Sequence, residues 1–305
     1  MNEPLARRPS RWLAIPERGS ALGIHFFVWA VTLGGRAVAR AVLWPVMLYY
    51  FVLSRAARRA SRAFLTRIGH PADRRAVFGH LLRFGQVALD RLLLVQGKTS
   101  GFEFDTGPAE LLDELRASPK GALLLGAHVG SFEAMAGMAR GTDLRVTAVV
   151  NTAGSRMFMD ALERLNPELA ARLIDLGQGR LDAIFEIRKR LEAGEHVCVL
   201  ADRCTAGERS VVVPFMGQDA RLPAGPYVLA ATLGCPVYFV AALYRGGNRY
   251  SIHAERFAER VDLPRKDRKA GLLKFAGLYA ERLEALARAE PTNWFNFYDF
   301  WALGE

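Results

Sequence analysis

Residues 121–133 read Gly-Ala-Leu-Leu-Leu-Gly-Ala-His-Val-Gly-Ser-Phe-Glu, and this stretch decides the fold. Residues 121–127 are apolar and uncharged, which predicts a strand buried on both faces, as in a parallel sheet. His128 follows at the carboxyl end of this strand. Ser131 is placed to cap a helix over residues 131–140. Glu133 lies in the first turn of that helix, where a carboxylate suits the helix dipole.

The position of His128 predicts a catalytic site. Ligands of open α/β sheets bind in the crevice beyond the carboxyl ends of the strands. A histidine there can act as a general base, and a carboxylate five positions later can orient its ring. Of the six histidines, only His128 has an acidic residue five positions later and follows a buried-strand pattern. We therefore predict that His128 and Glu133 form a catalytic pair.

Strand and helix patterns alternate through the rest of the chain. Further strands are predicted at 144–150, 173–177, 195–201 and 211–215, and a terminal hairpin at 236–244 and 250–255. Helices are predicted at 76–94, 112–117, 155–165, 182–193, 224–233 and 270–289. These spacings suit right-handed βαβ crossovers. We therefore expect an α/β fold with a mainly parallel twisted sheet flanked by helices.

Charge and composition point to acidic partners and a membrane. The 305 residues carry a net charge of +10, and 51% of them are hydrophobic. Such a balance favours anionic lipid headgroups, nucleic acid or an acidic carrier protein. The arginines cluster around apolar blocks and are not interleaved with aromatic residues, so we expect an anionic membrane surface and no nucleic acid.

The cysteines indicate neither a metal site nor a disulfide framework. Cys198, Cys204 and Cys235 form an odd set without the spacing of a zinc site. Such a set is typical of a reducing compartment, so we expect the catalytic part to be cytosolic. No metal and no cofactor are predicted.

The N-terminal third of the chain begins with a basic arm and two apolar blocks. Residues 1–20 are polar and basic, and blocks 21–35 and 41–53 are separated by Arg36 and Arg40. Neither block reaches the roughly 20 residues of a membrane-spanning helix. A single span would carry both arginines near its middle, at about 2.5–3.5 kcal/mol each.

Arginines flank both ends of these blocks, and the positive-inside tendency keeps both ends in the cytoplasm. We therefore predict a re-entrant hairpin or an interfacial helix pair, with one tilted transmembrane helix as the alternative. The predicted division is a membrane-associated N-terminal helical segment at 1–70 and a catalytic domain at 71–305.

A second cluster of unusual residues follows the strand at 195–201. Asp202-Arg203 ends that strand, then come Pro214-Phe215-Met216-Gly217 and the helix entry Pro223-Ala224-Gly225-Pro226. A helix start rich in free N–H groups suits an anion such as a phosphate. Ordinary turns are the alternative interpretation of these residues.

Taken in order, these blocks and His128-Val-Gly-Ser-Phe-Glu133 resemble the lysophospholipid acyltransferase superfamily. They most resemble the branch of bacterial lipid A late acyltransferases and predicted glycolipid acyltransferases. The resemblance implies that His128 and Glu133 are catalytic. It also implies an inner-membrane enzyme on the cytoplasmic face, with an acyl-carrier-protein or acyl-CoA thioester as donor and a lipid or glycolipid as acceptor.

The predicted reaction is O-acyl transfer without a covalent intermediate. Glu133 orients His128, which takes the proton of the acceptor hydroxyl, and backbone N–H groups of 130–132 stabilise the oxyanion. Arg203, held by Asp202, is expected to bind an anionic part of a substrate. The full predicted substrate-binding set is Gly130, Ser131, Asp202, Arg203, Phe215, Gly217, Pro223, Gly225, Arg156 and Arg221.

Two other functions remain open on the sequence. One is an acyl thioesterase or lipid hydrolase that uses the same pair, and the other is a non-enzymatic, membrane-bound lipid-binding protein. The aromatic run at 294–301 is predicted to pack in the core, with a membrane-interface belt as the alternative.

Overall fold

The structure of the chain, a computed structural model, describes residues 21–139, 141–150, 166–176, 180–204 and 208–302. The helix predicted at 155–165, and Arg156 with it, lie outside the described residues.

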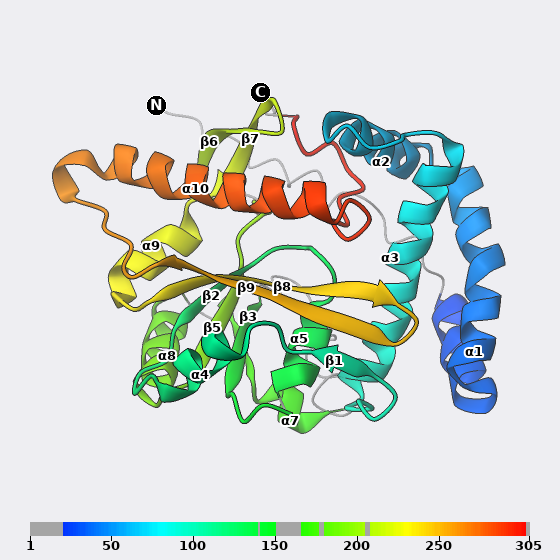
Figure 1. Cartoon of the computed structure of the whole chain (residues 1–305), viewed down its shortest axis with the longest axis horizontal. Helices are drawn as coiled ribbons and strands as arrows, with labels where there is room; N and C mark the ends of the chain where they lie inside the picture. Colours follow the sequence, from blue (N-terminus) through cyan, green and yellow to red (C-terminus); the bar gives the residue numbers. More distant parts are fainter. Residues whose placement is uncertain (1–20, 140, 151–165, 177–179, 205–207, 303–305) are drawn as a thin grey trace, which may run out of the picture.

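A seven-stranded sheet with the order β1-β9-β8-β2-β5-β3-β4 crosses the middle of the molecule (Figure 1). Its strands are β1 (Glu103–Asp105), β2 (Leu123–Gly126), β3 (Val146–Val150), β4 (Leu173–Asp175), β5 (His196–Leu200), β8 (Val237–Gly246) and β9 (Arg249–Ala258). Neighbouring strands are parallel except for the antiparallel pair β8 and β9. The predicted α/β class and mainly parallel sheet are confirmed.

Helices cover both faces of this sheet. They are α3 (Arg74–Val95), α4 (Ala109–Ala117), α5 (Phe132–Ala139), α7 (Pro167–Ala170), α8 (Arg180–Glu192), α9 (Gly225–Leu233) and α10 (Arg268–Ala289). Alternate residues of β2 enter two different cores, because successive side chains of a strand point to opposite faces. Leu123 and Leu125 join the core under α8, α9 and α10, whereas Leu124 joins the core under α4 and α5.

Two strands were not predicted, one because it is short and the other because it is polar. The three residues of β1 pair with β9, and β7 (Gln218–Pro223) forms a separate hairpin with β6 (Ser210–Phe215). The turn of this hairpin is Met216-Gly217, both with positive φ of 52° and 80°. Such angles match the twist of a two-residue hairpin turn, and glycine adopts them without strain.

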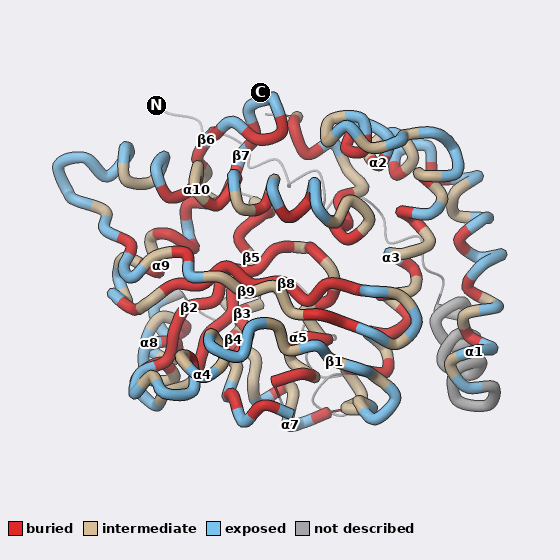
Figure 2. Tube along the Cα trace, viewed as in Figure 1, coloured by how far each residue is buried: buried red, intermediate tan, exposed pale blue. Residues whose placement is uncertain are grey.

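The N-terminal apolar blocks form one long helix, α1 (Ala21–Leu53), which is interrupted at Gly35 and followed by α2 (Arg55–Arg67). Ala39, Leu43 and Met47, four residues apart, are buried on the side that meets α3. The other side of α1 is largely exposed (Figure 2). Residues Gly35–Leu53 are long and apolar enough to cross a membrane.

Arg36 and Arg40 attach α1 to the rest of the fold. Arg36 Nη2 lies 2.7 Å and Arg40 Nη2 lies 3.6 Å from Oδ2 of Asp90, a fully buried residue of α3. Burial raises the pKa of Asp90, while the hydrogen bond and charge of Arg36 act in the opposite direction. The two arginines therefore have a carboxylate partner inside the protein. The choice between hairpin and single span, and the boundary at residue 70, stay predictions.

Candidate active site

The register of β2 and β5 brings His128 and Asp202 together. Gly126 pairs with Leu200 across these parallel strands, and each of the two side chains follows two residues later. His128 Nδ1 lies 2.7 Å from Asp202 Oδ1, and the His128 backbone N–H donates to Asp202 Oδ2 at 3.0 Å. The pair thus lies in the crevice where an open α/β sheet binds its ligands.

Asp202 is an ionised carboxylate at neutral pH. Complete burial by itself would raise the pKa of Asp202, but the charge and hydrogen bonds of His128, together with the charge of Arg203, lower it to about 2. An ionised carboxylate only accepts hydrogen bonds, so Nδ1 of neutral His128 carries the proton and Nε2 has the free lone pair. The His128 side chain is 33% exposed. Its ring can therefore be reached by a substrate.

The loop between β2 and α5 is held by neighbouring backbone. Gly130 has φ of +66°, and a Cβ there would lie 1.8 Å from the carbonyl oxygen of Ala242. The Gly130 amide donates to Asn293 O and the Ser131 amide to Ala242 O, both at 2.8 Å. Both amides already have acceptors in the fold, which contradicts the expected oxyanion role for these two. An oxyanion role of the Phe132 amide and substrate binding by Gly130 and Ser131 stay predictions.

Glu133 has partners other than His128. Ser131 Oγ accepts from the Ala134 amide at 3.1 Å, which confirms the predicted cap, and donates to Glu133 Oε2 at 3.2 Å. Glu133 Oε1 lies 2.7 Å from Nε of Arg91 on α3. Within the described chain, the carboxylate on the His128 ring is that of Asp202. The predicted orientation of His128 by Glu133 is corrected accordingly, whereas a catalytic role of Glu133 stays a prediction.

The contacts of Arg203 also differ from the predicted ones. Its Nη2 donates to Phe295 O at 2.7 Å, and its guanidinium lies 5.5 Å from the centre of the Tyr298 ring. Asp202 binds His128 with its oxygens and interacts with Arg203 through charge. Nε of Arg203 is buried and has no hydrogen-bond partner among the described residues. A ligand group that enters here could accept from it.

The remaining predicted substrate-binding residues lie on the β6–β7 hairpin and the start of α9. Phe215 is a core residue whose ring lies 5.6 Å from that of Trp294, and Gly217 forms the hairpin turn. Arg221 on β7 donates to Ser210 Oγ at 3.4 Å. Pro223 ends β7 and Gly225 begins α9. Substrate binding by these five residues stays a prediction.

The C-terminal aromatic run contributes a residue that was not predicted for the site. Trp294 Nε1 lies 3.4 Å from Asp202 Oδ2, and the Phe295 amide donates to His128 O at 3.0 Å. Trp294, Phe295, Phe300 and Trp301 are all buried, which confirms core packing for these residues. The available sequence signal was the indole N–H, which usually needs a hydrogen-bond partner when it is buried.

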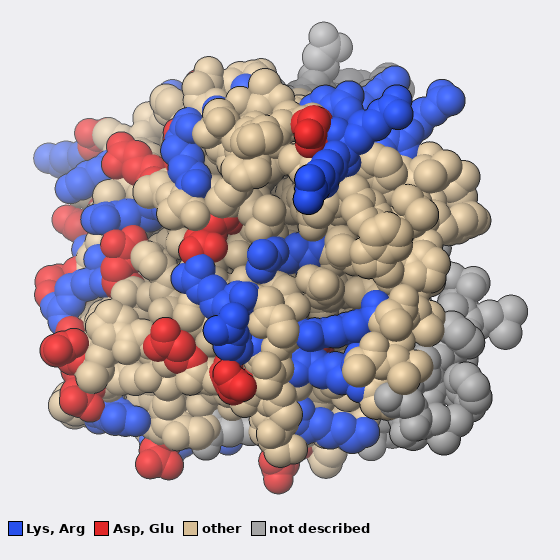
Figure 3. All heavy atoms as spheres, turned by 45° about the vertical axis from the view of Figure 1, so that its right-hand side comes forward, with Lys and Arg blue, Asp and Glu red and all other residues tan. Residues whose placement is uncertain are grey.

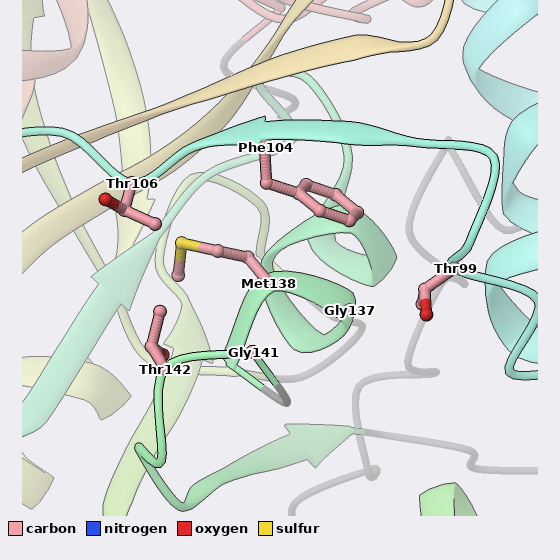
Figure 4. Close-up of a pocket in the computed structure, with 7 residues that line it drawn as sticks. All are labelled: Thr99, Phe104, Thr106, Gly137, Met138, Gly141 and Thr142. Carbon is pink, nitrogen blue, oxygen red and sulfur yellow. The ribbon is translucent and has the colours of Figure 1, made fainter.

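A hollow of about 370 Å³ lies beside α5, under β1 (Figure 4). It is lined by Thr99, Phe104, Thr106, Gly137, Met138, Gly141 and Thr142. A second cavity, of about 40 Å³ and almost entirely apolar, shares Thr106 and Met138 with it and extends toward Leu124 and Val240. Met138 therefore borders both spaces. Among the described residues, no group of three or more His, Cys, Asp or Glu side chains could hold a metal ion.

Comparison with known proteins identifies the family of the chain. The chain matches the family model of the bacterial lipid A biosynthesis acyltransferases over residues 96–302. The comparison with curated proteins finds no match. The matched span is more than half of the 305 residues and includes His128, Asp202 and the C-terminal aromatic run. The chain therefore belongs to the bacterial lipid A biosynthesis acyltransferase family and is a lipid acyltransferase.

Proposed function

We propose that this acyltransferase moves a fatty acyl chain from an acyl-carrier-protein or acyl-CoA thioester to a hydroxyl of a lipid or glycolipid. The observation that carries the proposal is the contact of 2.7 Å between His128 Nδ1 and a buried, ionised Asp202. This contact leaves Nε2 as the basic nitrogen on a partly exposed ring. It lies in a chain of the lipid A acyltransferase family.

In the proposed mechanism, His128 Nε2 takes the proton of the acceptor hydroxyl as its oxygen attacks the thioester carbonyl. The Asp202 carboxylate stabilises the imidazolium that forms. The tetrahedral intermediate then collapses, the carbon–sulfur bond breaks, and the imidazolium returns its proton to the leaving thiolate. An ester and a free thiol are the products, and His128 is neutral again.

We propose that Glu133 contributes to catalysis through its ion pair with Arg91. Its carboxylate holds the Arg91 guanidinium, whose side chain is 54% exposed, beside the first turn of α5. A guanidinium in this place suits phosphate groups of the donor or an anionic acceptor. We propose the same kind of contact for Arg203, because its buried Nε has no described partner.

We propose that the acyl chain enters the apolar space beside α5. The apolar cavity is small, about 40 Å³, and lies next to the hollow of about 370 Å³. Movement of Met138 would join it to the hollow of about 370 Å³. Met is the flexible side chain best suited to such repacking.

We propose that the exposed face of α1 binds the cytoplasmic surface of the inner membrane. Seven large apolar side chains are exposed there: Val38, Trp44, Val46, Leu48, Tyr49, Val52 and Leu53. Exposed Arg55, Arg59 and Arg62 follow on α2, and Figure 3 shows positive charge gathered around that end of the molecule. Apolar side chains next to arginines fit an interfacial helix on anionic lipids.

The enzymatic proposal is tested with the purified protein and radiolabelled acyl-carrier-protein or acyl-CoA thioesters. His128→Ala should retain donor binding and lose acyl transfer by at least about 100-fold, since general base catalysis contributes 10²–10⁴-fold. Full activity of this variant would reject the mechanism. Release of free fatty acid without an acceptor would indicate a thioesterase, and lipid mass spectrometry of cells with and without the protein identifies the acceptor.

The membrane proposal is tested by sedimentation with vesicles that contain anionic phosphatidylglycerol or only phosphatidylcholine. Leu48→Asp should weaken binding to the anionic vesicles about 10-fold or more. Leu273→Asp is the matched control, because Leu273 on α10 is 40% exposed and Leu48 is 42% exposed. Equal binding by both variants would reject this surface. Periplasmic labelling of Asn2→Cys in cells would instead exclude the hairpin arrangement.

A further inference from the structure

The C-terminal segment 293–296 runs along the loop that carries His128. Val129 and Trp294 form an antiparallel bridge, Gly130 N–H donates to Asn293 O at 2.8 Å, and Phe295 N–H donates to His128 O at 3.0 Å. The Asn293 side chain in turn accepts from the Tyr244 amide at 2.8 Å. The segment thus connects the His128 loop to β8, which also contacts the loop directly through the Ser131 amide.

Trp294 also reaches the carboxylate that binds the His128 ring. Its Nε1 lies 3.4 Å from Asp202 Oδ2, the oxygen that accepts from the His128 backbone N–H at 3.0 Å. Oδ1 faces Nδ1 of the ring at 2.7 Å. The terminal torsion of an aspartate is broad, so the side chain alone does not fix the orientation of the carboxylate plane relative to the ring. Two donors on Oδ2 leave Oδ1 for the imidazole.

The position of Trp294 is fixed by aromatic packing and by a hydrogen bond to its carbonyl oxygen. It is fully buried, with ring centres 4.8 Å from Phe64, 5.0 Å from Phe300 and 5.6 Å from Phe215. Its carbonyl oxygen lies 3.0 Å from Nε2 of buried His80, whose Nδ1 lies 2.9 Å from Ser61 Oγ. Helices α2 and α3 therefore hold the backbone of Trp294, while the aromatic core holds its indole.

We propose that Trp294 is a positioning residue for acyl transfer: its indole N–H holds the Asp202 carboxylate so that Oδ1 stays aligned with Nδ1 of His128. The hydrogen bond of the indole is with Asp202, so it acts through that carboxylate. The proposal rests on the proposed function, because it assumes that His128 is the base. A small misplacement of a catalytic group can cost about 100-fold in rate.

The test compares Trp294→Phe with Trp301→Phe in the full-length protein. Trp301 is the matched control, because it is a buried indole of the same cluster whose Nε1 donates to Phe215 O at 3.0 Å, away from Asp202. Trp294→Phe should lower kcat about 10-fold to 100-fold with KM changed less than about 2-fold. Trp301→Phe should leave kcat within about 3-fold of wild type, since it removes one hydrogen bond of the same kind elsewhere.

A second readout does not depend on turnover. In protein labelled with ¹⁵N-histidine, the His128 ring should show a protonated Nδ1 in wild type and Trp301→Phe, and a shifted Nδ1 signal from a weakened hydrogen bond to Asp202 in Trp294→Phe. An unchanged ring signal and kcat in Trp294→Phe would overturn the proposal, as would equal losses in both variants. Full activity of His128→Ala would reject the proposed function instead, and the ring signal would still decide whether Trp294 positions Asp202.

Discussion

The decisive perturbation is Asp202→Asn, which keeps the shape of the side chain and removes its charge. Asp202 is fully buried, and one oxygen lies 2.7 Å from His128 Nδ1. A unit charge roughly 4 Å from an imidazolium, at an effective dielectric constant of about 20, stabilises it by about 4 kcal/mol. That energy corresponds to a rate loss of about 1,000-fold. We therefore expect kcat for acyl transfer to fall by about this factor.

The assay is single-turnover acyl transfer from a saturating thioester, together with the ¹⁵N spectrum of the histidine rings. Glu133→Gln is the matched control, since it removes the other carboxylate by an equally conservative change. Asp202→Asn should abolish the protonated Nδ1 signal of His128. Glu133→Gln should retain that signal, whatever it does to the rate through Arg91. Loss of the Nδ1 signal in Glu133→Gln, together with its retention in Asp202→Asn, would refute the assignment of Asp202 as the orienting carboxylate.

Three further predictions concern stability. Gly130→Ala should prevent folding, or lower the unfolding temperature strongly, because its φ is +66° and a Cβ would lie 1.8 Å from the Ala242 carbonyl oxygen; a soluble variant with wild-type melting would contradict this. Asp90→Ala should lower the free energy of unfolding by about 3–5 kcal/mol, as measured in urea, because it removes the buried carboxylate that pairs with Arg36. Burial lowers the pKa of His80 from 6.5 to about 4, so the unfolded chain binds a proton there before the folded chain does. The stability that neutral His80 contributes is complete above about pH 6.5 and is lost as the pH falls toward 4, by about 3 kcal/mol in all. His80→Gln should therefore lose less stability than wild type between pH 7.5 and pH 5.

Much of the fold follows from local patterns. The apolar run at 121–127 predicts a buried strand, and β2 (Leu123–Gly126) lies within it. Ser131 caps α5 as its spacing indicates. Strands β1 and β7 were missed because three residues or an exposed polar segment leave no clear alternation to detect. Their pairing depends on distant strands, which local sequence does not specify.

The candidate site likewise follows partly from the sequence and partly from the tertiary structure. The sequence alone determines that His128 and Asp202 each lie just beyond a buried strand, and that a carboxylate stands five residues after His128. Only the tertiary structure decides which carboxylate meets the ring, because this depends on β2 and β5 being neighbours with Gly126 opposite Leu200. His128 and Asp202 each lie two residues beyond this pair. They therefore meet, although 74 positions of the chain separate them. Glu133, five positions away along the sequence, turns with the first turn of α5 toward Arg91 on α3.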